Sequence, residues 1–245
     1  HVSGDHYTIS EAWLDRVQEV LDYAVDDDMY VILNIHHDTD KEYCYPDKEH
    51  LEQSLSYMTF IWEQLADRFG DYDEHVIFES INEPRLVETD HEWWLDMNAA
   101  ECVEAVECIN EWNQNFVDVV RKTGGNNATR YLMVPGYDAS ADGVLNDKFV
   151  LPTDTAENEG KILVSVHAYI PYHFALQAAT ENESIDQFNA SEKTSTNDID
   201  QMMEKLYAKY ISNEIPVVIG EFGARDKNGN LQSRVDYAAY YIAAA

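Results

Sequence analysis

Four short apolar segments are each followed directly by polar or ionisable side chains. The four sets are His36-His37-Asp38, Asn82-Glu83, His167 with Tyr169, and Glu221. In parallel α/β proteins the carboxyl ends of the strands meet at one edge of the sheet, so such side chains can converge on one site. A single carboxylate at a strand end is often only a helix cap or an ion-pair partner. Four polar endings together indicate a catalytic or binding site.

Two of these residues are glutamates, Glu83 and Glu221, at the ends of different expected strands. Paired carboxylates across a groove are what cleavage of a glycosidic bond needs, because one protonates the leaving oxygen and the other attacks or assists attack at the anomeric carbon. Asn82 supplies an amide suited to a sugar hydroxyl, and Tyr169 could hydrogen-bond Glu221 and hold it oriented. Glu83 alone could equally be a capping carboxylate, but Glu221 at a matching strand end favours the catalytic interpretation.

The segments between these motifs alternate between helical and extended patterns. Apolar residues spaced three and four apart predict helices over residues 10–24, 51–69, 99–121, 198–211 and 233–243. Ser10 is the expected cap of the first helix, Asn197 or Asp198 caps the fourth, and Gly124-Gly125 closes the third. Short β-branched runs predict strands over residues 30–36, 76–82, 131–134, 162–166 and 216–219. Strands that do not alternate in polarity, separated by helices, indicate a parallel sheet covered by helices. With no repeat or linker visible, we expect one α/β domain over residues 1–245.

The number of strands and the length point to a particular architecture. A chain of 245 residues has the size of one (β/α)8 TIM barrel, for which ~250 residues is typical. Five strands are too few to close such a barrel, and the expected elements begin and end with a helix. We therefore expect a TIM barrel whose first two strands and last strand are not in this sequence.

The charge of the chain excludes several classes of function. Asp and Glu number 47 against 16 Lys and Arg, which gives a formal net charge of −31 and a pI near 4.3. A surface with this much negative charge repels nucleic-acid phosphates and anionic lipids. We therefore expect no nucleic-acid partner and no membrane partner. No apolar stretch approaches the ~18 residues of a membrane-spanning helix. The composition suits a protein that acts on a neutral substrate, and we expect the protein to be a monomer.

The motifs, taken in order, resemble those of glycoside hydrolase family 5, the cellulases of the (β/α)8 clan A. Asn-Glu-Pro alone is moderately specific, whereas four motifs in the family's order are highly specific, and they cover essentially the whole chain. Leu-Asn-Ile-His36-His37-Asp38 is similar to the third-strand motif of the family's subfamily 4. The other three motifs are Ile-Asn82-Glu83-Pro84, His167-Ala-Tyr169 and Ile-Gly-Glu221-Phe-Gly.

The resemblance implies a retaining mechanism and a role for each matching residue. Glu83 matches the family's acid/base on the fourth strand, and Glu221 matches the nucleophile on the seventh. The family's strand-two arginine and strand-eight tryptophan have no counterpart in the sequence. Residues that match those around the sugar in the −1 subsite are His36, His37, Asn82, His167 and Tyr169.

A metal site is the main rival interpretation of the histidines. His36, His37 and His167 could serve a metal-dependent barrel hydrolase, but zinc needs three or four converging ligands. Adjacent residues of a strand point to opposite faces, so His36 and His37 can share one metal only beyond the strand's end. We therefore expect sugar contacts at these histidines, with no metal and no cofactor.

Aromatic side chains divide into candidate sugar platforms and candidate core residues. Trp93 and Trp94 follow the Asn-Glu-Pro motif in an expected loop, where exposed indoles would stack on pyranose rings. Trp13, Trp62 and Trp112 lie on apolar helix faces and are expected in the core. Further aromatic residues in strand-end loops that could line subsites are Tyr43, Tyr45, Tyr137, Tyr172 and Phe174.

These observations predict a retaining endo-β-1,4-glycanase of the endoglucanase type that hydrolyses β-glucans, with a β-linked polysaccharide or oligosaccharide as its partner. A xyloglucanase or xylanase of the same family is the nearest alternative. A non-catalytic or truncated polysaccharide-binding protein is the alternative from another class. We expect a secreted protein of bacterial origin.

Overall fold

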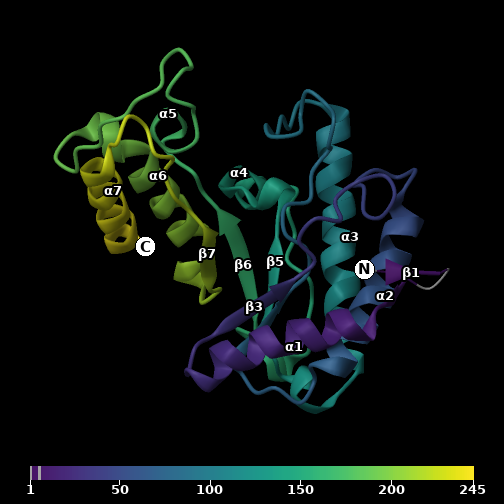
Figure 1. Ribbon diagram of the computed structural model, residues 1–245. Helices are drawn as coiled ribbons and strands as arrows, with labels where there is room; N and C mark the ends of the chain where they lie inside the picture. The colour runs from purple at the N-terminus through teal and green to yellow at the C-terminus, as the bar shows by residue number, and fades with distance from the viewer. Residues whose placement is uncertain (1, 5–6) are drawn as a thin grey trace. The chain divides into compact units, whose positions relative to one another are not determined.

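The computed structural model describes residues 2–4 and 7–245 and divides into two compact units, residues 1–165 and 166–245 (Figure 1). Each unit is described by itself. The boundary falls within strand β6 (Ile162–His167), whose last two residues belong to the second unit. No helix in the described part of the chain is long and apolar enough to cross a membrane.

The first unit alternates helices with parallel strands after a short antiparallel pair, β1 (Val2–Ser3) and β2 (Thr8–Ile9). Its helices are α1 (Glu11–Asp26), α2 (Leu51–Arg68), α3 (Ala100–Lys122) and α4 (Ala141–Leu145). Its strands after the antiparallel pair are β3 (Val31–Asn34), β4 (Val76–Glu79), β5 (Leu132–Pro135) and β6. Short 3-10 helices lie at Gly125–Ala128, Tyr137–Ala139 and Ala156–Asn158.

The strands pair in the order of the chain, β3-β4-β5-β6, and every pair is parallel. Val31 lies opposite Val76, and Leu132 lies opposite Ile162, so the carboxyl ends of the strands are aligned at one edge. A sheet in which each strand lies next to its successor is the sheet of a singly wound β/α repeat, because each helix returns the chain to the same side. This confirms the parallel α/β fold class predicted from the sequence.

The core of the first unit lies between α2, α3 and the sheet. Trp62 of α2 is fully buried, with its ring centroid 4.6 Å from that of Phe116 on α3 and 5.4 Å from that of Phe78 on β4. The Trp62 indole N–H donates to the carbonyl of Ser80 at 2.9 Å. The core therefore contacts the chain just beyond the end of β4, one residue past the strand.

A second polar link fixes the same segment. The Ser80 hydroxyl donates to Asn113 Oδ1 at 2.7 Å, and Asn113 Nδ2 donates to the carbonyl of Pro135 at 2.9 Å. All the side chains in this link are buried, so each satisfied bond avoids the cost of a buried unpaired polar group. Helix α3 thus connects the ends of β4 and β5 and fixes where the following loops begin.

Arg130 holds the turn between α2 and β4. Its buried guanidinium donates to the carbonyls of Val76 at 2.6 Å, Tyr72 at 2.5 Å and Asp73 at 2.8 Å, and it lies over the Phe78 ring. Burial lowers the pKa of Arg130 to about 10. These contacts tie the turn that follows α2 to the first residue of β4.

The second unit contains the end of β6 together with α5 (Tyr172–Ala175), α6 (Lys193–Lys209), the 3-10 helix Ile211–Asn213, β7 (Val217–Glu221) and α7 (Leu231–Ala244). Strand β7 lies beside β6. The core of the second unit is aromatic. The ring centroids of Phe222 and Tyr241 lie 4.7 Å apart in a stacked pair, and those of Tyr237 and Phe174 lie 5.3 Å apart. Helix α7 is thereby packed against the segments that follow β6 and β7.

Buried Lys227 ties two loops of the second unit together. Its ammonium group donates to the carbonyls of His173 at 2.5 Å and Ile185 at 3.0 Å. Burial and the neighbouring Arg225 hold the pKa of Lys227 below its usual value. The Arg225 N–H donates to the Ala175 carbonyl at 2.9 Å. The loop after β7 is therefore fastened to the loop after β6.

The predicted helices and strands are present, but β1, β2, α4 and α5 were not predicted, and β3 and β4 end at Asn34 and Glu79, before the expected ends at residues 36 and 82. Helix α6 begins at Lys193, earlier than the expected caps Asn197 or Asp198. Ser10 occupies the expected cap position of α1 but makes no capping hydrogen bond with its side chain. Trp13 is 41% exposed, which contradicts its expected place in the core. Leu14 forms the buried stripe of α1, and Trp13 is rotated from it by about 100° around the helix.

Candidate active-site residues

The end of β3 presents His36 and His37 to solvent. Both side chains are exposed, and their rings meet edge to face at 4.5 Å. The next residue, Asp38, accepts a hydrogen bond from the hydroxyl of Tyr57 at 2.6 Å, which fixes the loop to α2. Burial and this bond to Asp38 raise the pKa of Tyr57. Tyr57 therefore acts as a neutral donor that orients the loop carrying the two histidines.

A buried polar network lies inside the sheet beneath these residues. Glu79 of β4 is 2% exposed; one carboxylate oxygen accepts from Asn34 Nδ2 at 2.8 Å and the other from the Ser165 hydroxyl at 2.5 Å. The network connects β3, β4 and β6. A buried carboxylate is tolerated only when hydrogen bonds satisfy it, so these contacts lock the three strand ends together.

Asn82 and Glu83 follow β4 by three and four residues. The Asn82 N–H donates to the carbonyl of Ile35 at 2.9 Å, which ties this segment to the loop after β3. Asn82 is buried, and its carboxamide oxygen accepts no hydrogen bond from the part of the chain that the structure describes. A buried acceptor of this kind is costly unless a ligand or water supplies the donor. The Glu83 side chain is 18% exposed.

The loop after Glu83 is fastened to the turn after β5. The Asp138 N–H donates to the Pro84 carbonyl at 2.7 Å. Tyr137 is fully buried; its hydroxyl donates to the carbonyl of His91 at 2.6 Å and accepts from the N–H of Leu86 at 3.0 Å. Burial raises the pKa of Tyr137, so its hydroxyl remains a donor at neutral pH. Tyr137 is thus a brace for the loop and not a lining residue of a subsite.

The turn after β5 requires Gly136 and Gly143, because their backbones lie in close contact. A Cβ on Gly136 would lie 2.4 Å from the carbonyl carbon of Gly143, and a Cβ on Gly143 would lie 2.2 Å from the carbonyl oxygen of Tyr137. Both contacts are shorter than any side chain tolerates. Only glycine therefore fits at either position.

The two candidate sugar platforms are exposed. Trp93 and Trp94 are 52% and 63% exposed. The guanidinium carbon of Arg85 lies 4.0 Å from the centre of the Trp93 ring, within the range of a cation–π contact. Sequence reasoning missed Arg85; its position directly after Asn-Glu-Pro was the available signal.

The other candidate aromatic residues differ in exposure. Tyr45 and Phe174 are buried, as is Tyr137, whereas Tyr43 is partly exposed and Tyr172 is 39% exposed. Only the last two therefore remain available to a ligand at the surface.

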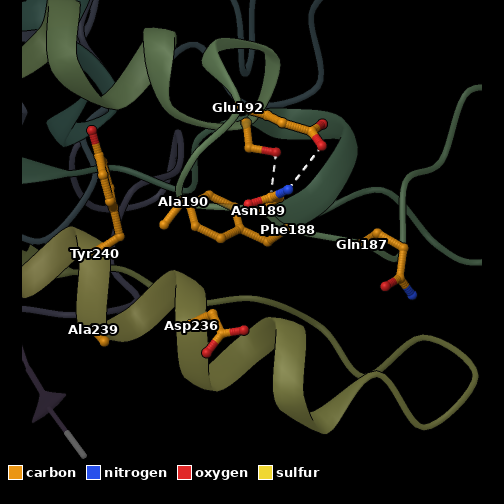
Figure 2. A pocket seen from close by; sticks show the side chains of 9 residues that line it. Gln187, Phe188, Asn189, Ala190, Glu192, Asp236, Ala239 and Tyr240 are labelled. Carbon is orange, nitrogen blue, oxygen red and sulfur yellow. Dashed lines mark hydrogen bonds between the residues drawn. The ribbon is translucent and has the colours of Figure 1, made fainter.

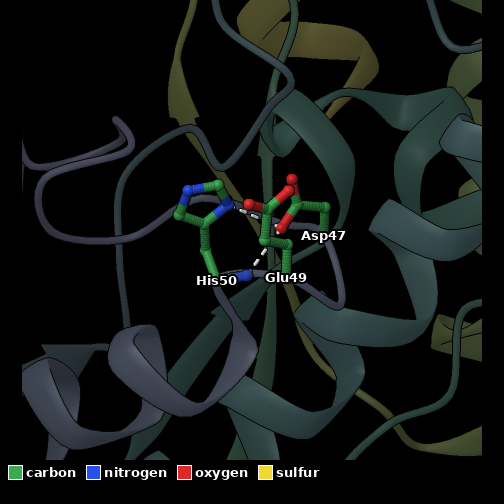
Figure 3. A group of neighbouring side chains, drawn as sticks. All are labelled: Asp47, Glu49 and His50. Carbon is green, nitrogen blue, oxygen red and sulfur yellow. Dashed lines mark hydrogen bonds and ion pairs between the residues drawn. The ribbon is translucent and has the colours of Figure 1, made fainter.

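Among the described residues of the first unit, a cluster of metal-type ligands does not contain the predicted histidines. Asp47, Glu49 and His50 gather in the turn before α2 (Figure 3). Asp47 Oδ1 accepts from both the backbone N–H and the ring Nδ1 of His50, at 2.8 and 2.7 Å. These bonds explain the cluster as the structured start of α2, where a carboxylate also complements the helix dipole.

In the second unit, His167, Tyr169 and Glu221 lie together. The hydroxyl of Tyr169 donates to Glu221 Oε2 at 2.6 Å, which is the hydrogen bond expected from the sequence. His167 is buried, and its Nδ1 lies 3.8 Å from Glu221 Oε1. The Glu221 side chain is 33% exposed. One carboxylate oxygen is therefore fixed by a short bond while the group stays accessible to a reactant.

Backbone contacts hold these three residues in register. The N–H of Ala168 donates to the carbonyl of Glu221 at 2.9 Å, as the two neighbouring strands end. The hydroxyl of Tyr241 donates to the carbonyl of Ala168 at 3.2 Å, and Tyr241 stacks on Phe222. Helix α7 thus contacts the segments that follow both β6 and β7.

A surface pocket of about 740 Å³ lies between the segment that leads into α6 and helix α7, and none of the predicted site residues lines it (Figure 2). Three of its lining residues are paired with one another: Asn189 Nδ2 donates to Glu192 Oε1 at 2.8 Å, and the Asn189 N–H donates to the Ser195 hydroxyl at 3.2 Å. These contacts organise the first turn of α6.

Comparison with known proteins places the chain in a family. The family model for cellulase (glycosyl hydrolase family 5) matches residues 1–245. Endoglucanase B of Ruminococcus albus is 40% identical over 242 residues, which are 99% of this chain and 54% of that protein. The chain thus spans about half the length of such relatives.

Similar solved structures point to the same family. A glycoside hydrolase 5 lichenase from a Caldicellulosiruptor species, in complex with cellotetraose, is 57% identical with a TM-score of 0.98, and the match covers all of this chain and 65% of that one. A GH5-4 broad specificity endoglucanase from Ruminococcus champanellensis with bound cellotriose is 42% identical with a TM-score of 0.87, and the match covers all of this chain and 66% of that one. The consecutive strand order is that of part of such a barrel, as expected. The family match over the full chain, together with these structures, shows that the chain belongs to glycosyl hydrolase family 5, the cellulase family.

Proposed function

We propose that the protein is a retaining endo-β-1,4-glucanase in which Glu221 is the nucleophile and Glu83 the acid/base. The observation that carries the proposal is the 2.6 Å hydrogen bond from Tyr169 to Glu221, because it fixes a partly exposed carboxylate at a strand end. Family membership supports the same assignment.

In the first step, Glu221 attacks the anomeric carbon of the sugar while the bond to the leaving oxygen breaks. Glu83 donates its proton to that oxygen, so the departing chain leaves as an alcohol and Glu83 becomes a carboxylate. Tyr169 holds one oxygen of Glu221 and thereby directs the other towards the anomeric carbon. The product of this step is a glycosyl ester of Glu221.

In the second step, water hydrolyses the glycosyl ester of Glu221. Glu83, now a carboxylate, takes a proton from the water, which attacks the anomeric carbon and releases Glu221. Two displacements at one carbon retain its configuration. This mechanism requires the two carboxyl groups to lie about 5–5.5 Å apart in the working enzyme, against about 6.5–9.5 Å for inversion.

The remaining predicted residues are proposed to bind the sugar. The buried Asn82 carboxamide oxygen, which accepts no bond from the described residues, would accept one from a sugar hydroxyl. The exposed His36 and His37 rings and the buried His167 would contact the same sugar from their strand ends. Trp93 and Trp94, both exposed, would stack on neighbouring rings.

The substrate proposed is a β-glucan. Several relatives are called endoglucanases, one similar structure is called a lichenase, and another, 35% identical, is called a xyloglucan-specific endo-β-1,4-glucanase. A glucan polymer is too large to enter a cell, so we also propose that the protein is secreted. Xyloglucan and xylan are the alternative substrates.

The test is the anomeric configuration of the first product released from a cello-oligosaccharide, followed by proton NMR. We expect the β-anomer to form first, with equilibration to the α-anomer afterwards. The α-anomer forming first would refute the retaining mechanism.

Variants separate the enzyme from its alternatives. Glu221→Gln and Glu83→Gln should each abolish release of reducing ends from β-glucan, whereas Glu204→Gln, an exposed matched change on α6, should not. Oligosaccharide binding without any cleavage by the wild-type protein would favour a binding protein. Loss of activity in the presence of a chelator would favour the metal-dependent alternative.

A further inference from the structure

Arg85 is held in place on three sides. Its Nη1 donates to the main-chain carbonyl of Glu83 at 2.9 Å, and its Nε lies 3.4 Å from Glu92 Oε1. Its guanidinium carbon lies 4.0 Å from the centre of the Trp93 ring. The side chain is only 18% exposed. A long, flexible side chain fixed by a hydrogen bond, an ion pair and an aromatic face occupies one position.

Glu92 is itself anchored, so it can act as a firm support. Its second carboxylate oxygen, Oε2, accepts from the N–H of Glu88 at 3.1 Å. The segment from Arg85 to Trp93 thus folds back on itself and returns a carboxylate and an indole to the same guanidinium. Neither Glu92 nor Trp93 is part of the buried core.

The same nitrogen of Arg85 that binds the Glu83 carbonyl lies 3.9 Å from Glu83 Oε2. This distance is too long for a hydrogen bond, so the contact is electrostatic. The guanidinium is therefore close enough to act on the charge of the Glu83 side chain without forming a hydrogen bond to Oε2.

We infer that Arg85 is a positioning residue for Glu83, and that it stabilises the carboxylate formed when Glu83 gives its proton to the leaving oxygen. The inference rests on the proposed function. A fixed cation beside a group that gains negative charge favours that step, because no reorganisation is needed when the charge appears. Glu92 and Trp93 hold the Arg85 guanidinium 3.9 Å from the Glu83 carboxylate.

Two substrates with different leaving groups test this role. Cellotetraose requires protonation of its leaving oxygen, whereas 2,4-dinitrophenyl β-cellobioside releases a stable anion and needs no acid. We expect Arg85→Gln to lower kcat/KM for cellotetraose by about 10- to 100-fold, part of the 10²–10⁴-fold that general acid catalysis typically contributes. For the dinitrophenyl substrate kcat/KM should fall less than about threefold, since kcat/KM reports only the first step.

Two further variants keep the test interpretable. Arg85→Lys keeps the positive charge but loses the planar guanidinium that hydrogen-bonds in two directions and stacks on Trp93. We expect its kcat/KM for cellotetraose to lie between those of Arg85→Gln and the wild type. Arg16→Gln, the same change at an exposed arginine of α1 that pairs with Glu19, should leave both substrates unaffected. Thermal unfolding of each variant checks that the fold is retained.

An equal loss with both substrates would overturn the inference, because it would mean that Arg85 only secures the loop. No loss with either would also overturn it. A wild-type protein that cleaves neither substrate would instead refute the proposed function, and that result is visible before any variant is compared.

Discussion

The hydrogen bond from Tyr169 to Glu221 makes a specific prediction about the first step of catalysis. Tyr169→Phe removes the hydroxyl and keeps the ring, so the change is confined to one bond of 2.6 Å. His167 Nδ1 lies 3.8 Å from the other carboxylate oxygen, Oε1, which is beyond hydrogen-bond range. The variant carboxylate therefore loses the hydrogen bond that fixes Oε2.

Two effects of this change oppose each other. Losing a donor makes the carboxylate a more reactive anion, which favours attack. Losing its orientation separates the attacking oxygen from the anomeric carbon, and misplacement by about 1 Å can cost 10²-fold. A hydrogen bond to a charged group contributes about 1.5–3 kcal/mol, equivalent to about 10- to 150-fold in rate. We expect orientation to dominate and kcat/KM to fall by a factor in this range.

The assay is the release of dinitrophenolate from 2,4-dinitrophenyl β-cellobioside, which reports formation of the glycosyl ester without the need for an acid. Tyr207→Phe, at an exposed tyrosine of α6, is the matched control and should match the wild type. A Tyr169→Phe enzyme within about threefold of the wild type would refute the claim that this bond positions the nucleophile.

Two predictions concern stability. Hydrogen bonds from Arg121, Asn158 and the Thr155 N–H outweigh the opposing effect of burial and hold the pKa of Asp154 below its usual value. Its stabilisation is therefore present above the unfolded-state pKa of about 3.9 and is lost as the pH falls through the lower folded-state value. Asp154→Asn should lower the free energy of unfolding by about 3 kcal/mol at pH 7 and by progressively less as the pH falls below about 3.9, measured by urea unfolding. A difference independent of pH would contradict this. Arg130→Met removes the donor from the buried carbonyl of Val76 and from the partly buried carbonyls of Tyr72 and Asp73, and it should lower the free energy of unfolding by about 3–5 kcal/mol. A loss below about 1 kcal/mol would show that water replaces the guanidinium.

Periodicity predicted most of the helices and strands because their apolar faces are continuous. Helix α2 begins at Leu51, as expected, and α3 ends at Lys122, just before the expected closing residues Gly124 and Gly125. The start of α6 was wrong because the run after Glu192 is polar, and the spacing of apolar residues carries no signal there. Trp13 was placed in the core because apolar type alone does not say which of two adjacent helix faces is buried.

The candidate residues were predictable where they follow a strand, and not where a loop folds back. Tyr169 and Glu221 lie at the ends of neighbouring strands, so their contact follows from strand order. The contacts of Arg85 with Glu92 and Trp93 form within an irregular segment that has no repeating pattern. Tyr137 shows the same limit, because its loop position suggested a subsite and the structure shows a buried brace.

The identity of the nucleophile is the central claim, and trapping the glycosyl ester tests it most directly. A 2-fluoro-cellobiosyl reagent slows the second step more than the first, so a retaining enzyme accumulates the ester. Intact mass should rise by one fluorocellobiosyl group per chain, and peptide mapping should place it on the peptide that contains Glu221 and not on the one that contains Glu83. Label on another carboxylate, or no label from a preparation that cleaves β-glucan, would contradict the account.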